Sequence, residues 1–112
     1  MLRVLKFILL VVFSGTNLFL FAQEDPYIKF KNYGIPDGLS MSRIFDIEQT
    51  PDGYLWVATA DGLNRFDGYE FKVYKNIPNN KSSLEENYIT SLEVDGNGDL
   101  WVGTNGGFLS YY

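Results

Sequence analysis

The chain has 112 residues, of which 46% are hydrophobic, 17% aromatic and 21% charged, and it contains neither cysteine nor histidine. The missing residue types exclude a Ser-His-Asp triad, a thiolate nucleophile, a metal site held by cysteine or histidine, and any disulfide bond. The formal net charge of −5 argues against nucleic-acid binding, which needs a basic surface.

The first 22 residues have the layout of a secretory signal peptide. Arg3 and Lys6 form a basic start, residues 7–13 are an uninterrupted apolar run, and Ala22 is a small residue before the expected cut. A retained membrane anchor is the alternative, but the apolar run is short against the ~20 residues that a span needs. We therefore expect a signal helix over residues 1–22 and export of the remainder.

Residues 44–67 and 89–112 are two copies of one repeat. A shift of 45 residues aligns them without a gap, and eight of the 24 aligned pairs are identical. The shared signature is G-x-L-W-V-[AG]-T, followed after two more residues by Gly. Its members are Gly53, Leu55, Trp56, Thr59 and Gly62 in the first copy and Gly98, Leu100, Trp101, Thr104 and Gly107 in the second. A period of about 40–50 residues is typical of β-propellers and similar arrays.

Each repeat predicts short antiparallel strands separated by turns. The strands expected in the first repeat are 44–49, 54–59, 63–66 and 69–74. Asp-Gly pairs between them favour hairpins in which both turn residues have positive φ, which Gly adopts freely and Asp tolerates. Residues 69–73 alternate apolar with charged side chains, as an edge strand does.

Residues 27–31 have the same alternation, so the exported chain begins with an outer strand that has no sheet of its own. Propellers commonly close by pairing such a strand with the last blade. The predicted fold class is therefore all-β, an incomplete β-propeller. Its expected parts are a signal peptide (1–22), an outer closing strand and connector (23–43), a complete blade (44–74), a connector (75–88) and a partial blade (89–112). Because a ring needs at least four blades, we expect a longer protein of which this is the N-terminal piece.

These motifs resemble the repeats of the two-component regulator propeller family. Asp37-Gly38-Leu39-Ser40 matches the opening of the family pattern, residues 52–59 match its core, and residues 61–68 with Phe71 and Tyr74 complete it. The resemblance implies a periplasmic sensor region, dimeric and anchored at the inner membrane in the full-length protein. It also implies a β-sandwich domain, one membrane span, a histidine kinase, a receiver and a DNA-binding domain, all outside this sequence.

Two sequence features suggest ligand sites and have plainer structural explanations. Asp95-Gly96-Asn97-Gly98-Asp99 resembles the start of a calcium loop, but Leu100 and Gly106 stand where such a loop needs Gly and Glu. We therefore expect no metal there and interpret it as a turn whose Asp and Asn side chains bond to the backbone. Trp56 and Trp101 could stack on sugars, but their apolar strands favour the core.

Ligand contacts are expected instead from loops at one rim of the ring. The candidates are Arg43, Asn64, Arg65 and Tyr88. Paired carboxylates for glycoside hydrolysis are available in number, but most acidic residues lie beside Gly in turns. We therefore expect no catalytic residue and no cofactor in this chain.

The leading functional hypothesis is a non-enzymatic fragment of a periplasmic ligand-sensing propeller. It would detect a glycan-derived oligosaccharide and signal across the membrane to a histidine kinase absent from this chain. Its expected partners are the remaining blades of the same protein and a second copy in a homodimer. The alternatives are a secreted binding propeller without signalling and a fragment of a propeller glycoside hydrolase or lyase.

Overall fold

The computed structural model describes residues 27–112, so the predicted signal peptide lies outside the described residues. Residues 32–112 form one compact unit, and residues 27–31 belong to a separate N-terminal unit. The compact unit is all-β, as expected, with one three-residue 3-10 helix, η1 (Ile35–Asp37), before the first strand. Within residues 27–112 no helix is long and apolar enough to cross a membrane.

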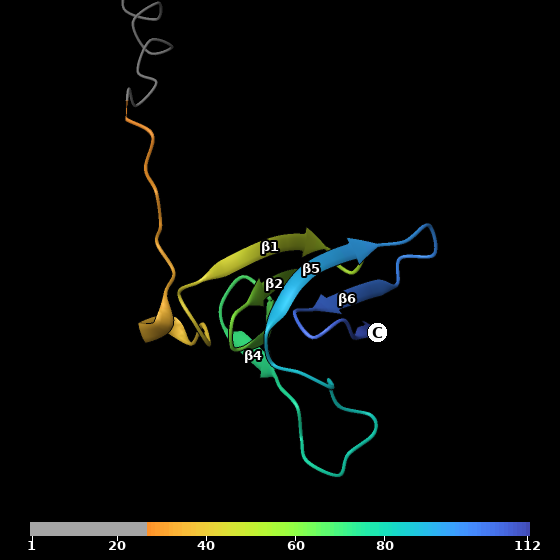
Figure 1. The fold of residues 1–112 in the computed structure, drawn as a ribbon. Coiled ribbons are helices and arrows are strands. Elements are labelled where there is room, and N and C mark those ends of the chain that lie inside the picture. The colour runs from red at the N-terminus through yellow and green to blue at the C-terminus, as the bar shows by residue number, and fades with distance from the viewer. Residues whose placement is uncertain (1–26) are drawn as a thin grey trace, which may run out of the picture. The chain divides into compact units, whose positions relative to one another are not determined.

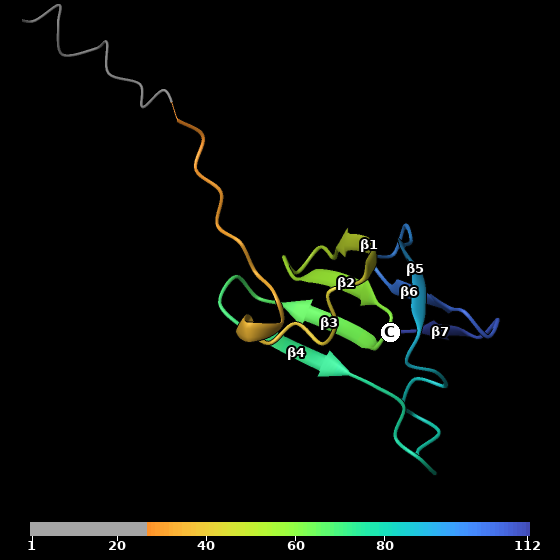
Figure 2. The same ribbon diagram turned by 60° about the vertical axis from the view of Figure 1, so that its left-hand side comes forward.

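Two antiparallel sheets make up the unit (Figures 1 and 2). The first sheet has the order β1-β2-β3-β4, and the second has the order β5-β6-β7. The strands of the first sheet are β1 (Ile44–Gln49), β2 (Leu55–Thr59), β3 (Gly62–Phe66) and β4 (Phe71–Tyr74). Those of the second are β5 (Ile89–Val94), β6 (Leu100–Thr104) and β7 (Leu109–Tyr111). The complete and partial meanders expected from the repeat are therefore present.

The turns differ from the expected hairpin type. Among the described residues only Asn79 combines a side chain with positive φ, so the Asp residues of the Asp-Gly pairs are not left-handed. In the β1–β2 turn the N–H of Gly53 donates to the carbonyl of Thr50 at 2.9 Å, and Gly53 has φ of 92°. Pro51 takes the second position of this turn and Gly53 the fourth, the places that a type I turn favours for them. A single left-handed Gly therefore suffices where two such residues were expected.

The start of β4 is also later than the sequence indicated. The carboxylate of Asp67 accepts hydrogen bonds from the N–H groups of Tyr69 and Glu70, at 2.8 and 2.9 Å. These two N–H groups are thus committed to the turn, and the strand begins only at Phe71.

The two repeats superpose in register until the end of their second strands and then slip by one residue. Trp56 lies opposite Arg65, whereas Trp101 lies opposite Tyr111, one residue further than a shift of 45 predicts. The β6–β7 turn is thus one residue longer than the β2–β3 turn. The alignment of Gly62 with Gly107 without a gap is therefore wrong, and in the structure Leu63 of the first repeat corresponds to Leu109 of the second.

The core lies between the sheets because each sheet turns one apolar face to the other. The first sheet contributes Trp56, Ala58 and Leu63, and the second contributes Ile89, Leu92, Leu100 and Val102. The ring of Tyr112 packs against that of Trp56 with centroids 5.1 Å apart. One polar bond also crosses the interface, from the N–H of Leu92 to Asp46 Oδ2 at 2.9 Å.

The prediction that both tryptophans are core residues is half right. Trp56 is 1% exposed, but Trp101 is 36% exposed because it lies on the face of the second sheet that points away from the first. The expected outer closing strand does not form in this structure, since residues 27–34 lie outside every strand. A strand needs a neighbouring edge to satisfy its backbone groups.

Candidate functional site

One end of the two sheets carries an exposed stack of side chains. At this end, called here the rim, β1 and β5 begin and β2 and β6 end. The guanidinium carbon of Arg43 lies 5.3 Å from the ring centroid of Phe45, and that ring lies 5.2 Å from the ring of Tyr88, tilted by 36°. Arg43, Phe45 and Tyr88 together form the rim stack. It unites two of the four predicted ligand candidates.

A β-bulge places Phe45 in this stack. The register between β1 and β2 shifts between Ile44 and Asp46, so Phe45 has no partner on β2. Bulges re-aim a side chain away from the regular alternation of a strand. Phe45 consequently stays 38% exposed. Sequence reasoning missed it, although the apolar pair Ile44-Phe45 breaks the strict alternation that a regular half-buried strand would show.

The second repeat has the same bulge with different chemistry. The register between β5 and β6 shifts between Ile89 and Ser91, which leaves Thr90 in the position of Phe45. The hydroxyl of Thr90 donates to the carbonyl of Gly103 at 3.3 Å. The bulge is thus a property of the repeat, whereas the residue on it differs between the copies.

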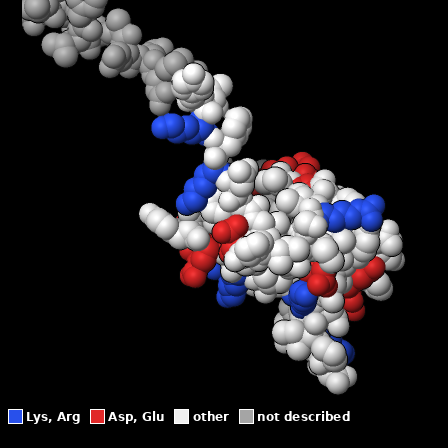
Figure 3. All heavy atoms as spheres, turned by 90° about the vertical axis from the view of Figure 1, so that its left-hand side faces the viewer, with Lys and Arg blue, Asp and Glu red and all other residues white. Residues whose placement is uncertain are grey.

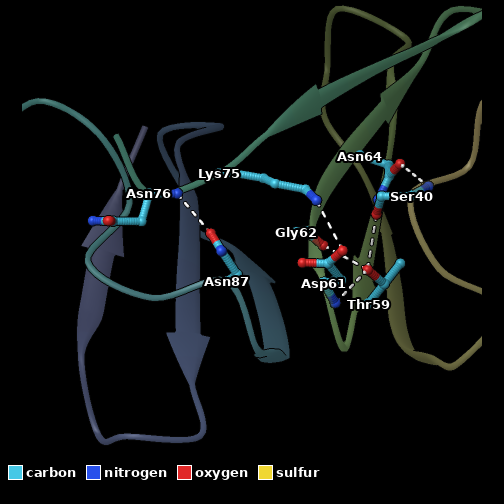
Figure 4. Close-up of polar contacts among 8 residues, drawn as sticks. All are labelled: Ser40, Thr59, Asp61, Gly62, Asn64, Lys75, Asn76 and Asn87. Atoms are coloured by element: carbon cyan, nitrogen blue, oxygen red, sulfur yellow. Dashed lines mark hydrogen bonds and ion pairs between the residues drawn. The ribbon is translucent and has the colours of Figure 1, made fainter. Parts of the chain in front are cut away.

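Asn64 lies in the core of the first repeat and has no exposed surface (Figure 4). Its Oδ1 accepts the N–H of Ser40 at 3.0 Å, and its Nδ2 donates to the Ser40 hydroxyl at 2.7 Å. That hydroxyl also lies 3.0 Å from Thr59 Oγ1. Both ends of the amide are used to hold the Asp37–Ser40 segment on β2 and β3, so Asn64 offers nothing to a ligand in this structure.

Arg65 is separated from the rim stack. Its guanidinium carbon lies 4.3 Å from the ring centroid of Tyr54, which precedes β2 at the opposite end of the sheet. A guanidinium on an aromatic face is a favourable cation–π contact. The four predicted candidates therefore divide into a rim pair, a buried amide and a stacked arginine.

Polar bonds tie the 75–88 connector to the rim (Figure 4). Lys75 forms an ion pair with Asp61 in the β2–β3 turn at 2.8 Å. The side chain of Asn87 accepts the N–H of Asn76 at 2.7 Å, and its carbonyl accepts the N–H of Gly62 at 2.6 Å. On the second repeat, the carbonyl of Tyr88 accepts the N–H of Asn105 at 3.0 Å. These bonds hold the backbone beneath Tyr88 against both sheets.

The Asp95–Asp99 segment is a turn closed by its own side chain, as predicted. Asp95 Oδ1 accepts the N–H groups of Asn97 and Asp99 at 2.8 and 3.0 Å. Its Oδ2 accepts the indole N–H of Trp101 at 2.9 Å. These bonds, that of the indole first, lower the pKa of the Asp95 carboxyl. Within residues 27–112, no three acidic side chains converge on a metal-sized site.

The same position in the first repeat holds a hydroxyl. The indole N–H of Trp56 donates to Thr50 Oγ1 at 2.9 Å, and Thr50 precedes Trp56 by the six residues that separate Asp95 from Trp101. Each tryptophan is therefore oriented by an oxygen in the preceding turn. In the second repeat the Asp99 carboxylate also raises the pKa of the neighbouring Tyr111 hydroxyl.

An open cleft of about 1020 Å³ lies between β4, the connector and β7. Apolar side chains line it, including Trp56, Tyr74, Ile77, Leu84 and Tyr112, and lysines such as Lys72 and Lys81 also border it. In the view of Figure 3, acidic and basic side chains are scattered among other residues, and neither sign gathers into a single patch.

Comparison with known proteins agrees with this architecture. The family described as "Two component regulator propeller" matches residues 38–61 and 83–106, which hold the first two strands of each sheet with part of the segment before them. This chain carries two-component regulator propeller repeats. The two matches share the 45-residue period found in the sequence.

The repeats are 46% identical over 74 residues to the protein named histidine kinase P4 of Formosa agariphila. That match covers 66% of this chain and 5% of the kinase. They also resemble the crystal structure of the extracellular domain of a hybrid two-component system from B. thetaiotaomicron, at 32% identity and a TM-score of 0.67. That match covers 73% of this chain and 12% of the other. The chain thus spans a small part of each, and it is similar to a fragment of an extracellular propeller domain.

Proposed function

We propose that these propeller repeats belong to the exported, ligand-sensing part of a hybrid two-component sensor and that they help detect a glycan-derived oligosaccharide. The rim stack carries this proposal. Phe45 is 38% exposed and its ring packs with that of Tyr88, so the pair offers aromatic surface to the apolar face of a sugar ring, and Arg43 adds a fixed positive charge beside it. A guanidinium forms strong, directional hydrogen bonds with carboxylate or sulfate groups.

In this proposal the chain acts by binding and not by catalysis. The ligand favours one arrangement of a periplasmic propeller dimer, and this preference is passed across the inner membrane to a kinase that lies outside the chain. The similarity to a histidine kinase and to the extracellular domain of a hybrid system supports this placement. The chain itself contains no histidine that could accept a phosphoryl group.

The test is a titration of the chain with a panel of neutral, uronate-containing and sulfated oligosaccharides, followed by NMR. We expect at least one class to shift the resonances of Phe45 and Tyr88. The Phe45→Ala variant should weaken binding about five- to tenfold, since it removes one aromatic contact worth about 1–1.5 kcal/mol.

Tyr69→Ala is the matched control, because Tyr69 is an aromatic residue with 92% exposure in the β3–β4 turn. Its removal should leave the affinity unchanged. If no oligosaccharide binds, or if the Phe45→Ala and Tyr69→Ala variants bind equally well, the proposal is wrong.

A further inference from the structure

Arg43 and Tyr88 occupy the same position in the two repeats, directly before the first strand of each sheet. The carbonyl of Arg43 accepts the N–H of Ala60 at 3.2 Å, and the carbonyl of Tyr88 accepts the N–H of Asn105 at 3.0 Å. Ala60 and Asn105 directly follow the second strands of their sheets. The same backbone bond thus fixes this position in both copies, and only the side chain differs. One copy presents a cation at the rim and the other an aromatic ring.

The carboxylates that lie around the rim have other partners. Asp61 forms its ion pair with Lys75 at 2.8 Å, and Glu86 Oε2 accepts the N–H of Gly106 in the β6–β7 turn at 2.6 Å. Among residues 27–112, no carboxylate forms an ion pair with Arg43, whose side chain is exposed. The guanidinium donors of this residue are therefore available to a ligand.

Asp46 is the carboxylate closest to Arg43 along the chain, and it too is engaged elsewhere. Its Oδ1 accepts the N–H of Ile47 and its Oδ2 accepts the N–H of Leu92, both at 2.9 Å. Both oxygens are thus held by backbone groups of β1 and β5. This arrangement leaves the positive charge of Arg43 without an acidic partner in the described part of the chain.

We propose that Arg43 sets the ligand class of the rim stack, and that this class is an anionic sugar. Arg43 binds the carboxylate or sulfate group of the sugar, while the apolar face of the sugar packs on the aromatic surface of Phe45 and Tyr88. The planar guanidinium presents paired donors that match two oxygens of either group. This inference rests on the proposed function and narrows it, since a neutral oligosaccharide would also satisfy that function.

The aromatic contact prepares the guanidinium for this task. The guanidinium carbon of Arg43 lies 5.3 Å from the ring centroid of Phe45, a favourable cation–π contact. A side chain already held over a ring loses less conformational freedom when a ligand binds, and this reduces the entropic cost of the contact.

The charge of the whole chain makes the direct contact necessary. The formal net charge is −5, so the protein as a whole repels an anion. This repulsion is screened beyond ~8 Å in physiological salt, and a cation that touches the anionic group therefore dominates its binding. A neutral sugar gains nothing from that cation. Loss of Arg43 should therefore affect the two ligand classes differently.

The test uses hexose oligosaccharides in three forms that differ only at C6, which carries a hydroxymethyl group, a carboxylate or a sulfate ester. Glucose, galactose and mannose backbones of each form are titrated into the chain, and binding is measured by calorimetry. We expect at least one backbone to bind in an acidic form at least about fivefold more tightly than in its neutral form. The carboxylate and sulfate arms show which group the ligand carries, and a preference for either supports the inference.

Variants separate the charge from the aromatic stack. Arg43→Gln should reduce the affinity for the acidic form to about that for the neutral form, and Phe45→Ala should weaken both forms by the same factor. Arg43→Lys keeps the charge but loses the paired donors, so it should recover only part of the preference. Lys81→Gln is the matched control, because it removes the same charge from an exposed position of the connector outside the rim stack. It should keep the preference of the parent.

Arg43 is exposed and precedes β1, so its variants should keep the parent circular dichroism spectrum. The NMR resonance of the Arg43 side-chain Nε–H gives a readout without any substitution, and it should shift with the acidic form and not with the neutral form. An unshifted resonance at saturation would overturn the inference. So would a neutral form that binds as tightly as its acidic counterparts, or an unchanged preference in Arg43→Gln, and each of these results leaves the proposed function standing. If no form of any backbone binds, both are wrong.

Discussion

The two tryptophans provide a matched pair for testing what holds the sheets together. We consider Trp56→Ala and Trp101→Ala, which remove the same side chain from the same strand position in the two repeats. Trp56 is 1% exposed and Trp101 is 36% exposed, so the two differ by about a third of the residue's surface. A tryptophan buries about 150–250 Å², so this third corresponds to about 50–80 Å². At ~25 cal/mol per Å² the difference in transfer free energy is about 1–2 kcal/mol.

Cavity formation increases this difference. Trp56 contacts Tyr74 and Tyr112, with ring centroids 5.7 and 5.1 Å away, and these neighbours belong to different sheets. Removing a fully enclosed Trp side chain typically costs about 3–5 kcal/mol because the surroundings relax only partly. Trp101 lies on an open face, where solvent fills the space. We therefore expect Trp56→Ala to destabilise the chain by at least about 2 kcal/mol more than Trp101→Ala.

The assay is urea unfolding followed by far-UV circular dichroism, which reports mainly on the backbone and does not need indole fluorescence. It is done at a concentration at which light scattering reports a monomer, so that association does not bury Trp101. Equal losses of unfolding free energy in the two variants, or a larger loss for Trp101→Ala, would refute the assignment of the core to the space between the sheets.

Three further predictions concern single contacts. Gly98→Ala should cost about 1 kcal/mol or more beyond Gly53→Ala, because both glycines have positive φ but only at Gly98 would a Cβ lie 2.9 Å from Pro51 Cγ; equal unfolding midpoints in urea would contradict the clash. Asn64→Ala should cost about 2–3 kcal/mol by the same measurement, and its effect should not add to that of Ser40→Ala because the two share hydrogen bonds; strict additivity in the double variant would exclude that coupling. The backbone N–H groups of Glu70 and Tyr69 lower the pKa of Asp67, and the indole N–H of Trp101, followed by the backbone N–H of Asp99, lowers the pKa of Asp95. Both carboxylates therefore stabilise the fold above the ordinary Asp pKa of 3.8, and this contribution is lost as pH falls through their lowered pKa values. Carboxyl-carbon NMR titration should give midpoints below 3.8 for both groups, and Asp67→Asn and Asp95→Asn should flatten the acid dependence of stability; midpoints at or above 3.8 would argue against these turns.

The sequence predicted the strands well because two local signals coincide. Apolar strand residues such as Leu55-Trp56-Val57 are bounded by Gly-containing turns, so strand positions follow from short-range chemistry. The boundary error at β4 has the same local origin, since the Asp67 side chain competes for two N–H groups that would otherwise join the ladder.

Properties that depend on distant partners were not predictable in this way. Asn64 resembles a surface residue beside Arg65, and only Ser40, which is 24 residues away, makes its burial favourable. Trp101 carries the pattern of a core residue, but whether it is covered depends on a neighbouring sheet and not on its own strand. Phe45 enters the candidate site through a bulge, whose effect on register appears only when β1 pairs with β2.

The one-residue difference between the β2–β3 and β6–β7 turns has a bearing on how such repeats diversify. The strand frame from Ile44 to Thr59 is reproduced from Ile89 to Thr104 with the same bulge and the same indole-to-turn bond. The extra residue of the β6–β7 turn lies beyond these strands, so it leaves the register of Trp101 and the other residues of β6 with β5 unchanged. A change in the length of this turn can therefore alter the edge that contacts a ligand while the packing of the strands stays the same. A new specificity then costs little of the free energy of unfolding.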